Sequence, residues 1–513
     1  MRTTLVTTSL VILTPALACR EPTAVRSPAR PSFSTAATVA CPSHATFVVS
    51  DEATLLSAIA TAQPNDTIAL SGMIELAGSS AFVTTNALTF TCASPGAGLR
   101  AKVDAGIDWL FLVLSNHVTV EHLTLDATYN TAGAVVVDGG TDAQLTGNTI
   151  SCGPFACAFY NNGSRVFIAD NSFTGSQTGT ALFGLVLFGL GEDVRIVRNQ
   201  FQFVGKQQGS CIQIEGATGI AQKVLISHNR FEVDNQLAIL VVGANDTRVE
   251  ENTFNGILGA GGTGDPVIFI TVTHGRITDN SGECGDACVF GAGGSPGLVL
   301  ARNQFQTAGS SAGFLLQENT DGDSVVGNTI VTTKPSFVPG FGGIRIRDGA
   351  NAVVNDNIIT GPWANSLALT DVTNADVERN SLQGASRFGI GITTEESVGP
   401  ISLTGSLFRA NRVTGAGMAG IFAQLACNNS FVGNNLQGNA GDVGLVFDNT
   451  TGANTFTGNA NLVVDNGAFD CDGDGVNDPN IISGPGIARH GLQLSGLASE
   501  TNPQHKIYGV LLK

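Results

Sequence analysis

Short runs of alternating apolar and polar residues recur along most of the chain, separated by Gly, Asn and Asp. Alternation with a period of two places successive side chains on opposite faces and therefore predicts half-buried β-strands. Many runs end in an Asn followed two places later by a bulky apolar residue, as in Arg198-Asn199-Gln200-Phe201. This pattern predicts two short strands joined by a turn at the Asn.

The Asn-marked pattern recurs about every 26 residues, as in a solenoid of stacked units. A unit of this length cannot bury its own apolar face, whereas stacked units share one core. Asn tolerates the left-handed backbone conformation, so we expect each Asn to turn the chain itself and to join a ladder of side-chain amides. Copies centre on Asn148, Asn171, Asn199, Asn229, Asn252, Asn280, Asn303, Asn328, Asn357, Asn380, Asn411, Asn434 and Asn459.

A second run in each unit supplies a further strand, typified by Gly343 to Asp348, in which Ile344 and Ile346 are expected to point inward. The repeat predicts about 13 to 14 coils, with Phe173 and its counterparts in later coils stacked inside. Near the front, Asp51 to Ile59 is typical of a capped amphipathic helix.

These features resemble the right-handed parallel β-helix proteins of the pectin-lyase-like superfamily, particularly those with Asn-marked repeats, over residues 46–466. The resemblance implies an all-β fold consisting of a single-stranded right-handed parallel β-helix, whose N-terminal end is capped by the helix. It also implies an activity on polysaccharides at one outer face, since many members of the superfamily are polysaccharide lyases or hydrolases. The Trp-Ile-Asp-His and Arg-x-Pro-x-x-Arg motifs of pectate lyases and the Asp-Asp and Gly-His-Gly motifs of polygalacturonases are absent from the sequence, which argues against an enzyme.

Composition narrows the class of protein further. Of 513 residues, 42% are hydrophobic and only 13% are charged, and the formal net charge is -17. The chain is too apolar for disorder, and its acidity without a basic stripe argues against a nucleic-acid partner. We expect a monomer whose partner is a polysaccharide or another component of the cell envelope.

The first residues predict export. Arg2 precedes an apolar run and the small residues Ala16-Leu17-Ala18, so residues 1–18 are interpreted as a signal peptide. Cys19 follows at once, which leaves two alternatives: lipidation of Cys19 in the bacterial cell envelope, or ordinary secretion. The lipid would be the chain's single contact with a membrane. Residues 19–45 are rich in Pro, Ser and Thr and predict a flexible linker.

The cysteines favour disulfides, because the protein is expected to be exported. Their spacings do not match those of common zinc sites. The positions are compatible with pairs of Cys41 with Cys92, Cys152 with Cys157, Cys284 with Cys288, and Cys427 with Cys471, which would leave Cys211 over, but the sequence does not fix the connectivity.

One group on the predicted outer face is a candidate catalytic site. Arg345 and Arg347 point outward, and Glu318, Asp348 and Asp371 fall in one column on successive coils, roughly 5 Å apart. Such a column suits a retaining glycosidase, a bound cation, or a uronate lyase in which an arginine neutralises the sugar carboxylate. The alternative is that acidic residues favour turns and the arginines pair with them in solvent. The row that contains Arg345 is otherwise largely apolar, so we expect loops to roof it.

The second candidate is an acidic loop within residues 467–513, which we interpret as a C-terminal cap segment. Asp470, Asp472, Asp474 and Asp478 occupy positions 1, 3, 5 and 9 of an EF-hand-type pattern, although Ile481 stands where a glutamate is usual. The loop resembles the calcium loops of thrombospondin type 3 repeats. It predicts a structural Ca²⁺, against the alternative of an acidic surface turn.

Two function classes follow from the sequence. The first is an exported or surface-anchored scaffold that binds carbohydrate or an envelope component without catalysis. The second is a polysaccharide lyase or glycoside hydrolase that acts on an acidic polysaccharide with Arg345, Arg347, Asp348 and Asp371. The sequence alone does not decide between them.

Overall fold

The computed structural model describes residues 41, 44–175, 181–203, 209–216, 223–233, 237–255, 265–285, 287–307, 312–335, 342–392, 403–460, 462–484 and 487–490. The predicted signal peptide, most of the predicted linker and Cys19, the candidate lipidation site, lie outside these residues. Thr38–Lys513 forms one compact unit and is considered alone. No helix in its described part is long and apolar enough to cross a membrane.

The described chain begins with β1 (Phe47–Val49) and one α-helix, α1 (Glu52–Thr61). The Asp51 side chain accepts the Thr54 N–H at 2.8 Å, which caps the helix, and Leu55, Ala58 and Ile59 are buried. This confirms the capping helix expected over residues 51–59.

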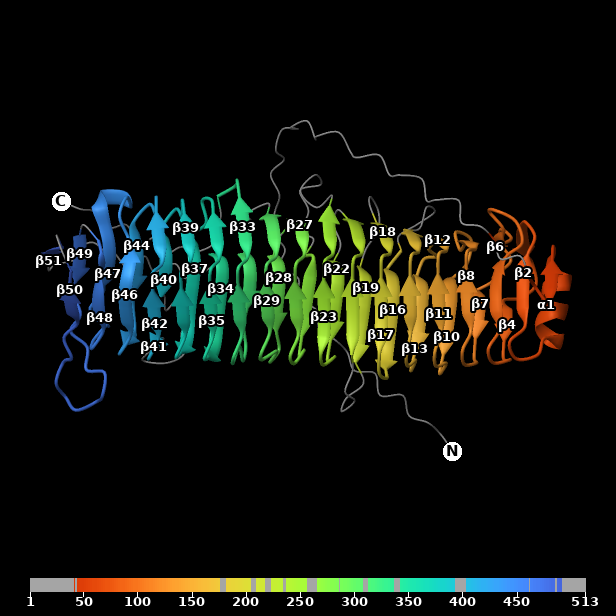
Figure 1. Ribbon diagram of the computed structural model, residues 1–513, viewed down its shortest axis with the longest axis horizontal. Coiled ribbons are helices and arrows are strands. Elements are labelled where there is room, and N and C mark those ends of the chain that lie inside the picture. Colours follow the sequence, from red (N-terminus) through yellow and green to blue (C-terminus); the bar gives the residue numbers. More distant parts are fainter. Residues whose placement is uncertain are drawn as a thin grey trace. The chain divides into compact units, whose positions relative to one another are not determined.

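Three rows of parallel strands then build a solenoid of about 15 turns, in which each strand pairs with its counterpart on the next coil (Figure 1). Row 1 contains the strands that precede the Asn positions. Its members are β2 (Thr67–Leu70), β5 (Thr89–Cys92), β8 (Thr119–Glu121), β11 (Gln144–Thr146), β14 (Phe167–Ala169), β17 (Val194–Val197), β20 (Val224–Ser227), β23 (Thr247–Glu250), β26 (Arg276–Thr278), β29 (Val299–Ala301), β32 (Ser324–Val326), β35 (Val353–Asn355), β38 (Asp376–Glu378), β42 (Leu407–Arg409), β46 (Ser430–Asn435), β48 (Thr455–Asn459) and β50 (Ile481–Ser483).

Row 2 contains the strands that follow the Asn positions and belongs to the same sheet as row 1. Its members are β3 (Met73–Leu76), β6 (Gly98–Ala101), β9 (Thr124–Asp126), β12 (Thr149–Ser151), β15 (Ser172–Thr174), β18 (Gln200–Phe203), β21 (Arg230–Val233), β24 (Thr253–Asn255), β27 (Ser281–Cys284), β30 (Gln304–Thr307), β33 (Thr329–Thr332), β36 (Ile358–Thr360), β39 (Ser381–Gln383) and β43 (Arg412–Thr414).

Row 3 closes each coil and forms the second sheet. Its members are β4 (Ala81–Val83), β7 (Trp109–Val113), β10 (Gly133–Asp138), β13 (Ala156–Asn161), β16 (Phe183–Leu190), β19 (Ser210–Gly216), β22 (Leu237–Val242), β25 (Val267–Ile270), β28 (Ala287–Ala292), β31 (Ala312–Leu316), β34 (Gly342–Ala350), β37 (Asn365–Thr373), β40 (Phe388–Ile392), β41 (Leu403–Thr404), β44 (Ala419–Ala423), β45 (Ala426–Cys427), β47 (Val443–Phe447), β49 (Leu462–Asp465) and β51 (Ala488–His490). A short 3-10 helix, η2 (Ala440–Asp442), precedes β47.

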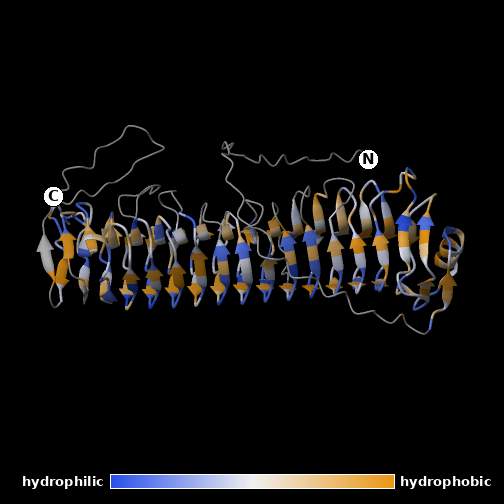
Figure 2. Cartoon of the chain, turned by 90° about the horizontal axis from the view of Figure 1, so that it is seen from above, coloured by the Kyte–Doolittle hydropathy of each residue, from blue (hydrophilic) through white to orange (hydrophobic). Residues whose placement is uncertain are grey.

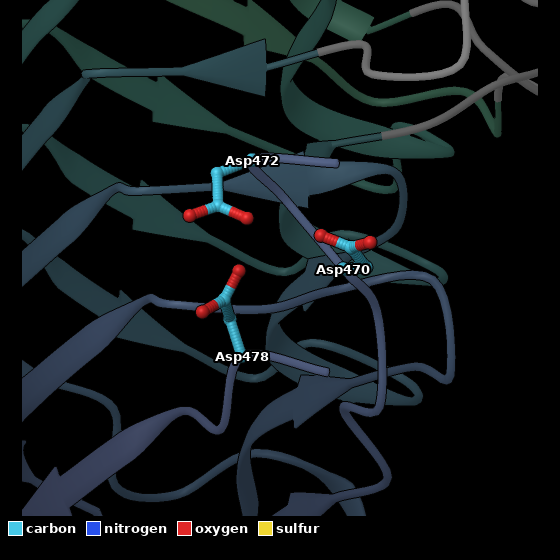
Figure 3. Close-up of side chains that lie close together, drawn as sticks. All are labelled: Asp470, Asp472 and Asp478. Atoms are coloured by element: carbon cyan, nitrogen blue, oxygen red, sulfur yellow. The ribbon is translucent and has the colours of Figure 1, made fainter. Parts of the chain in front are cut away.

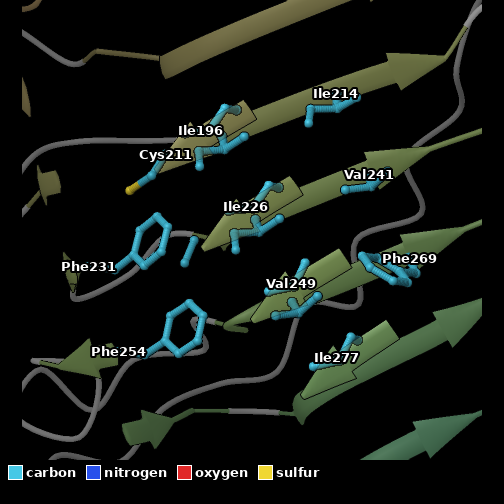
Figure 4. Close-up of a cluster of buried hydrophobic side chains, with 14 of the residues drawn as sticks. Ile196, Cys211, Ile214, Ile226, Phe231, Val241, Val249, Phe254, Phe269 and Ile277 are labelled. Atoms are coloured by element: carbon cyan, nitrogen blue, oxygen red, sulfur yellow. The ribbon is translucent and has the colours of Figure 1, made fainter. Parts of the chain in front are cut away.

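The core lies between the rows. Ile226 and Val249 of row 1, Phe231 and Phe254 of row 2, and Phe269 of row 3 all point into it (Figure 4). The aromatic stack is confirmed: ring centroids lie 4.9 Å apart for Phe201 and Phe231, and 5.0 Å for Phe231 and Phe254. Hydrophobic residues recur at matching positions of successive strands (Figure 2). Each coil therefore stacks its apolar side chains on those of the next.

The Asn ladder is confirmed from Asn148 to Asn434. In each step, one amide oxygen accepts the backbone N–H and the side-chain N–H of the preceding coil's Asn; for Asn199 the acceptor is Asn229 Oδ1, at 2.8 and 3.0 Å. Asn459 does not continue the ladder in register, because it pairs with Asn435 rather than with Asn434.

The expectation that the Asn itself is left-handed was wrong. The positive φ belongs to the residue before it, for example 55° at Arg198 and 58° at Asp279. A left-handed residue at that place bends the strand, so that the Asn which follows points inward and its amide meets the ladder.

The solenoid also extends past the boundary predicted at residue 466. β50 pairs with β48, and β51 pairs with β49. The acidic loop is therefore an insertion inside a coil and does not follow the last one. The front adds coils as well, since β2, β5 and β8 precede the first Asn. This explains why the solenoid has slightly more turns than the Asn count predicts.

All four disulfides suggested by the cysteine positions are present, and among the described cysteines Cys211 is the remaining thiol, buried in the core. The bond between Cys41 and Cys92 ties the start of the described chain to β5, and the bond between Cys427 and Cys471 ties the acidic loop to β45.

Candidate functional site

The predicted carboxylate column exists on the outer face at the end of row 3. Leu316, Ile346 and Leu369 are register partners on β31, β34 and β37. Two residues further along each strand stand Glu318, Asp348 and Asp371, with φ of 65°, 58° and 52°. Asp348 and Asp371 thus occupy equivalent left-handed positions on successive coils, and Glu318 lies in the left-handed turn after β31, close enough for its charge to act on Asp348.

Asp348 is the most perturbed member of this column. Its Oδ2 lies 3.0 Å from Arg347 Nε. Partial burial raises the pKa of the Asp348 carboxyl, the Arg347 charge opposes that rise, and the neighbouring Asp371 and Glu318 charges add to it. A carboxyl in this setting holds its proton to higher pH than a solvated aspartate, which is a property of a general acid.

The two arginines differ in environment. The Arg347 side chain is 24% exposed, whereas Arg345 is only 3% exposed. The residues opposite Arg345 on the two neighbouring strands, Leu315 and Ala368, are also buried, as expected for a row that loops cover. The alternative that both arginines pair with carboxylates in solvent is therefore wrong for Arg345.

A second carboxylate pair was missed by the sequence analysis. Asp376 and Glu378 lie two residues apart on one face of β38, and Glu378 forms ion pairs with Arg379 and Arg409. Burial and the Glu378 charge raise the pKa of Asp376, whereas the hydrogen bond from Arg409 lowers the pKa of Glu378. The sequence feature that could have revealed this pair is two acidic residues at positions i and i+2 of one strand, together with an arginine at the matching position of the next coil.

The acidic loop brings three of its four predicted ligands together. One carboxylate oxygen each from Asp470, Asp472 and Asp478 lies within 4.8 Å of the others (Figure 3). Asp474 is not part of this group; its side chain accepts the Val476 N–H at 2.8 Å. The predicted four-ligand set is thus corrected to three gathered carboxylates, which suit a hard cation with oxygen ligands.

The outer face of row 2 is polar over many coils. Core residues such as Ile150 and Phe173 point inward, so the residues before them on each strand point outward. We call these outward residues the polar ribbon. They are in register from coil to coil and comprise Thr149, Ser172, Gln200, Arg230, Thr253, Ser281, Gln304 and Thr329.

Comparison with known proteins agrees with the fold. The family model described as right handed beta helix region matches residues 74–254, 210–382 and 298–461. No curated protein matches the chain.

Solved structures that are similar to the chain include two alginate lyases and a tailspike protein. An alginate lyase from Paenibacillus sp. str. FPU-7 is 14% identical, with a TM-score of 0.31 over 62% of this chain and 98% of the lyase. A PL6 alginate lyase solved with a trisaccharide is 14% identical, with a TM-score of 0.41 over 86% of this chain and 93% of the lyase. A tailspike protein mutant of E. coli bacteriophage HK620, solved with a pentasaccharide, is 9% identical, with a TM-score of 0.44 over 85% and 75%. These likenesses concern the fold and assign no activity to this chain.

Proposed function

Since the chain belongs to the right-handed β-helix family, we propose that it is an exported protein, secreted or held in the bacterial cell envelope, that binds a polysaccharide or another envelope component along its outer face without cleaving it. The polar ribbon carries this proposal. Its hydroxyl and amide side chains each donate and accept hydrogen bonds. The coils present them about 4.8 Å apart, so a long hydroxylated polymer can meet the same chemistry repeatedly.

The test is retention of the purified mature protein in gels that contain pectate, alginate, glycosaminoglycans or neutral glycans. We expect retention by at least one polymer, with no new reducing ends and no unsaturated-uronate absorbance. Gln304→Ala should weaken binding by roughly two- to tenfold, the value of one hydrogen bond. Gln144→Ala on row 1, which is also an exposed glutamine, is the matched control. The absence of retention by every polymer would refute the proposal.

A second candidate function rests on the raised pKa of Asp348 beside Asp371 and the buried Arg345. In a hydrolase, Asp348 would donate its proton to the leaving glycosidic oxygen, and Asp371 would attack the sugar or activate water. In a lyase, the partly exposed Arg347 would neutralise the uronate carboxylate. Arg347→Ala with Asp348→Asn should then lower turnover by about a hundredfold or more, yet leave retention by the polymer intact. A wild-type protein without turnover on any polymer would exclude this candidate.

Calcium at the acidic loop is the third part of the proposal, with a structural role. Three gathered carboxylates repel one another, and a divalent cation relieves that repulsion while the disulfide to Cys427 holds the loop in place. At a calcium concentration one hundred times the Kd, binding contributes about 2.7 kcal/mol. Chelation should therefore lower the unfolding temperature.

Variants sharpen this calcium prediction. Asp470→Asn should remove most of the stabilisation by calcium, whereas Asp474→Asn should remove much less, because only Asp470 belongs to the gathered group. An unfolding temperature that does not respond to chelation would show that the loop is an acidic surface turn.

A further inference from the structure

A groove of about 470 Å³ lies on the outer face of row 1, across β23, β26 and β29. It is distinct from the carboxylate column of row 3 and from the acidic loop. Three arginines line it, and between them lie a carboxylate, a hydroxyl and a small apolar floor. The lining comprises Arg248, Glu250, Arg276, Thr278, Val299, Ala301 and Arg302.

Two of these arginines face the groove from adjacent strands in direct register. Arg248 of β23 pairs with Arg276 of β26, so their backbones are about 4.8 Å apart. Like charges directly opposite each other destabilise a sheet. Arg302 adds a third guanidinium from the left-handed turn position that follows β29, with φ of 55°. Three guanidinium groups thus lie around one groove of a chain with a formal net charge of -17.

The arginines differ in how their charges are balanced. Arg248 Nε lies 2.7 Å from Glu250 Oε1, and Arg302 forms two hydrogen bonds with Asp279, at 2.8 and 2.5 Å. Arg276 is exposed and, within the described part of the chain, makes no ion pair or side-chain hydrogen bond. Its guanidinium keeps its donors available for a ligand, beside a second arginine that a carboxylate already orients.

We propose that this groove binds a carboxylate or sulfate group of an acidic glycan, with Arg276 as the anchor. A guanidinium donates two parallel hydrogen bonds to such an oxyanion. Arg248 and Arg302 are already paired with Glu250 and Asp279, so Arg276 supplies the unpaired charge, and Val299 and Ala301 offer apolar surface to the sugar ring. This inference rests on the proposed carbohydrate function and names the chemical class of glycan and the place where it is recognised.

The test compares Arg276→Gln with Arg412→Gln. Arg412 on β43 is also exposed and, among the described residues, also lacks an ion pair, so both variants lose one equivalent charge. We expect pectate, as the carboxylate probe, or dextran sulfate, as the sulfate probe, to retain the wild type. Arg276→Gln should weaken that binding about tenfold or more, whereas Arg412→Gln should leave it unchanged. Binding should also fall with added salt, because the attraction is electrostatic.

The outcomes separate this inference from the proposed function. If both variants lose glycan affinity equally, or if the protein binds neutral glycans alone, the proposed role of the groove is wrong although the protein still binds carbohydrate. If no glycan binds, the proposed function fails. Binding of inorganic sulfate, measured by calorimetry, then tests the groove by itself. A sulfate affinity that is the same in the wild type and in Arg276→Gln overturns the groove in that case, and a loss confined to Arg276→Gln supports it.

Discussion

Replacing Asp323 with asparagine is expected to stabilise the solenoid at pH 8 and to leave its stability at pH 4 nearly unchanged. Asp323 is fully buried at the turn before β32. Its Oδ1 accepts the Leu298 N–H at 2.9 Å, and its Oδ2 has no hydrogen-bond partner among the described residues. Burial raises the pKa of this carboxyl to about 7. Later coils place an amide at the equivalent position, in Asn429 and Asn454.

The direction of the pH effect follows from proton linkage. The folded-state pKa of about 7 lies above the ordinary value of 3.8, so the folded protein binds the proton more tightly than the unfolded chain. The stability that Asp323 contributes is therefore complete below about pH 4, falls as the pH rises to about 7, and stays low above that. The loss amounts to at most about 4 kcal/mol. An asparagine does not titrate, so it avoids this loss.

The measurement is the denaturant midpoint of the wild type and of Asp323→Asn at pH 4, 6 and 8. The difference in denaturant midpoint between the two proteins should grow with pH. Taking this difference cancels the contribution of every other titrating group, because both proteins contain those groups. Asp104→Asn, at an exposed left-handed position, should change the midpoint only slightly, because its side chain is exposed. A difference for Asp323→Asn that is equal at all three pH values would contradict the raised pKa.

Asn303→Ala is expected to destabilise the solenoid by about 3 to 6 kcal/mol. Asn303 is fully buried, and its Oδ1 accepts the backbone and side-chain N–H groups of Asn280, both at 3.0 Å. Its Nδ2 donates to the Ile277 carbonyl at 2.8 Å and to Asn328 Oδ1 at 2.9 Å. Alanine leaves two or three buried polar groups without partners, each at a cost of about 1 to 3 kcal/mol.

Denaturant unfolding with Gln304→Ala as the control tests this prediction. Gln304 is the next residue, but it points outward and is exposed, so its truncation should change the free energy of unfolding by less than about 0.5 kcal/mol. Hydrogen exchange adds a local measure, because the amide of Asn280 should exchange faster in Asn303→Ala than in the wild type. A destabilisation no larger than that of Gln304→Ala would show that the ladder is not a source of stability.

Much of the fold could be predicted because its information is local. Alternation over a few residues decides which side chains face the core, and the recurrence of Asn decides where each coil turns. The aromatic stack followed from the same spacing, since equivalent residues of successive coils must lie above one another. The pattern left one detail open. The left-handed residue of each turn could be the Asn itself or the residue before it, and both turns have the same sequence signature. In the structure it is the residue before the Asn.

The sequence by itself therefore determined the repeat, the direction of the core side chains and the capping helix, and it suggested the disulfide pairs without fixing their connectivity. Only the tertiary structure decided that Arg345 is buried while Arg347 stays partly exposed, and that one oxygen of Asp323 has no hydrogen-bond partner among the described residues. It also decided that Asp474 lies apart from the other three aspartates and that Arg248 and Arg276 share a groove. The physical reason is that burial, charge pairing and pKa depend on neighbours about 25 residues away, one coil up or down. The spacing of the repeat sets which strands pair, but the length of each turn and the loops over the outer face decide which side chains meet.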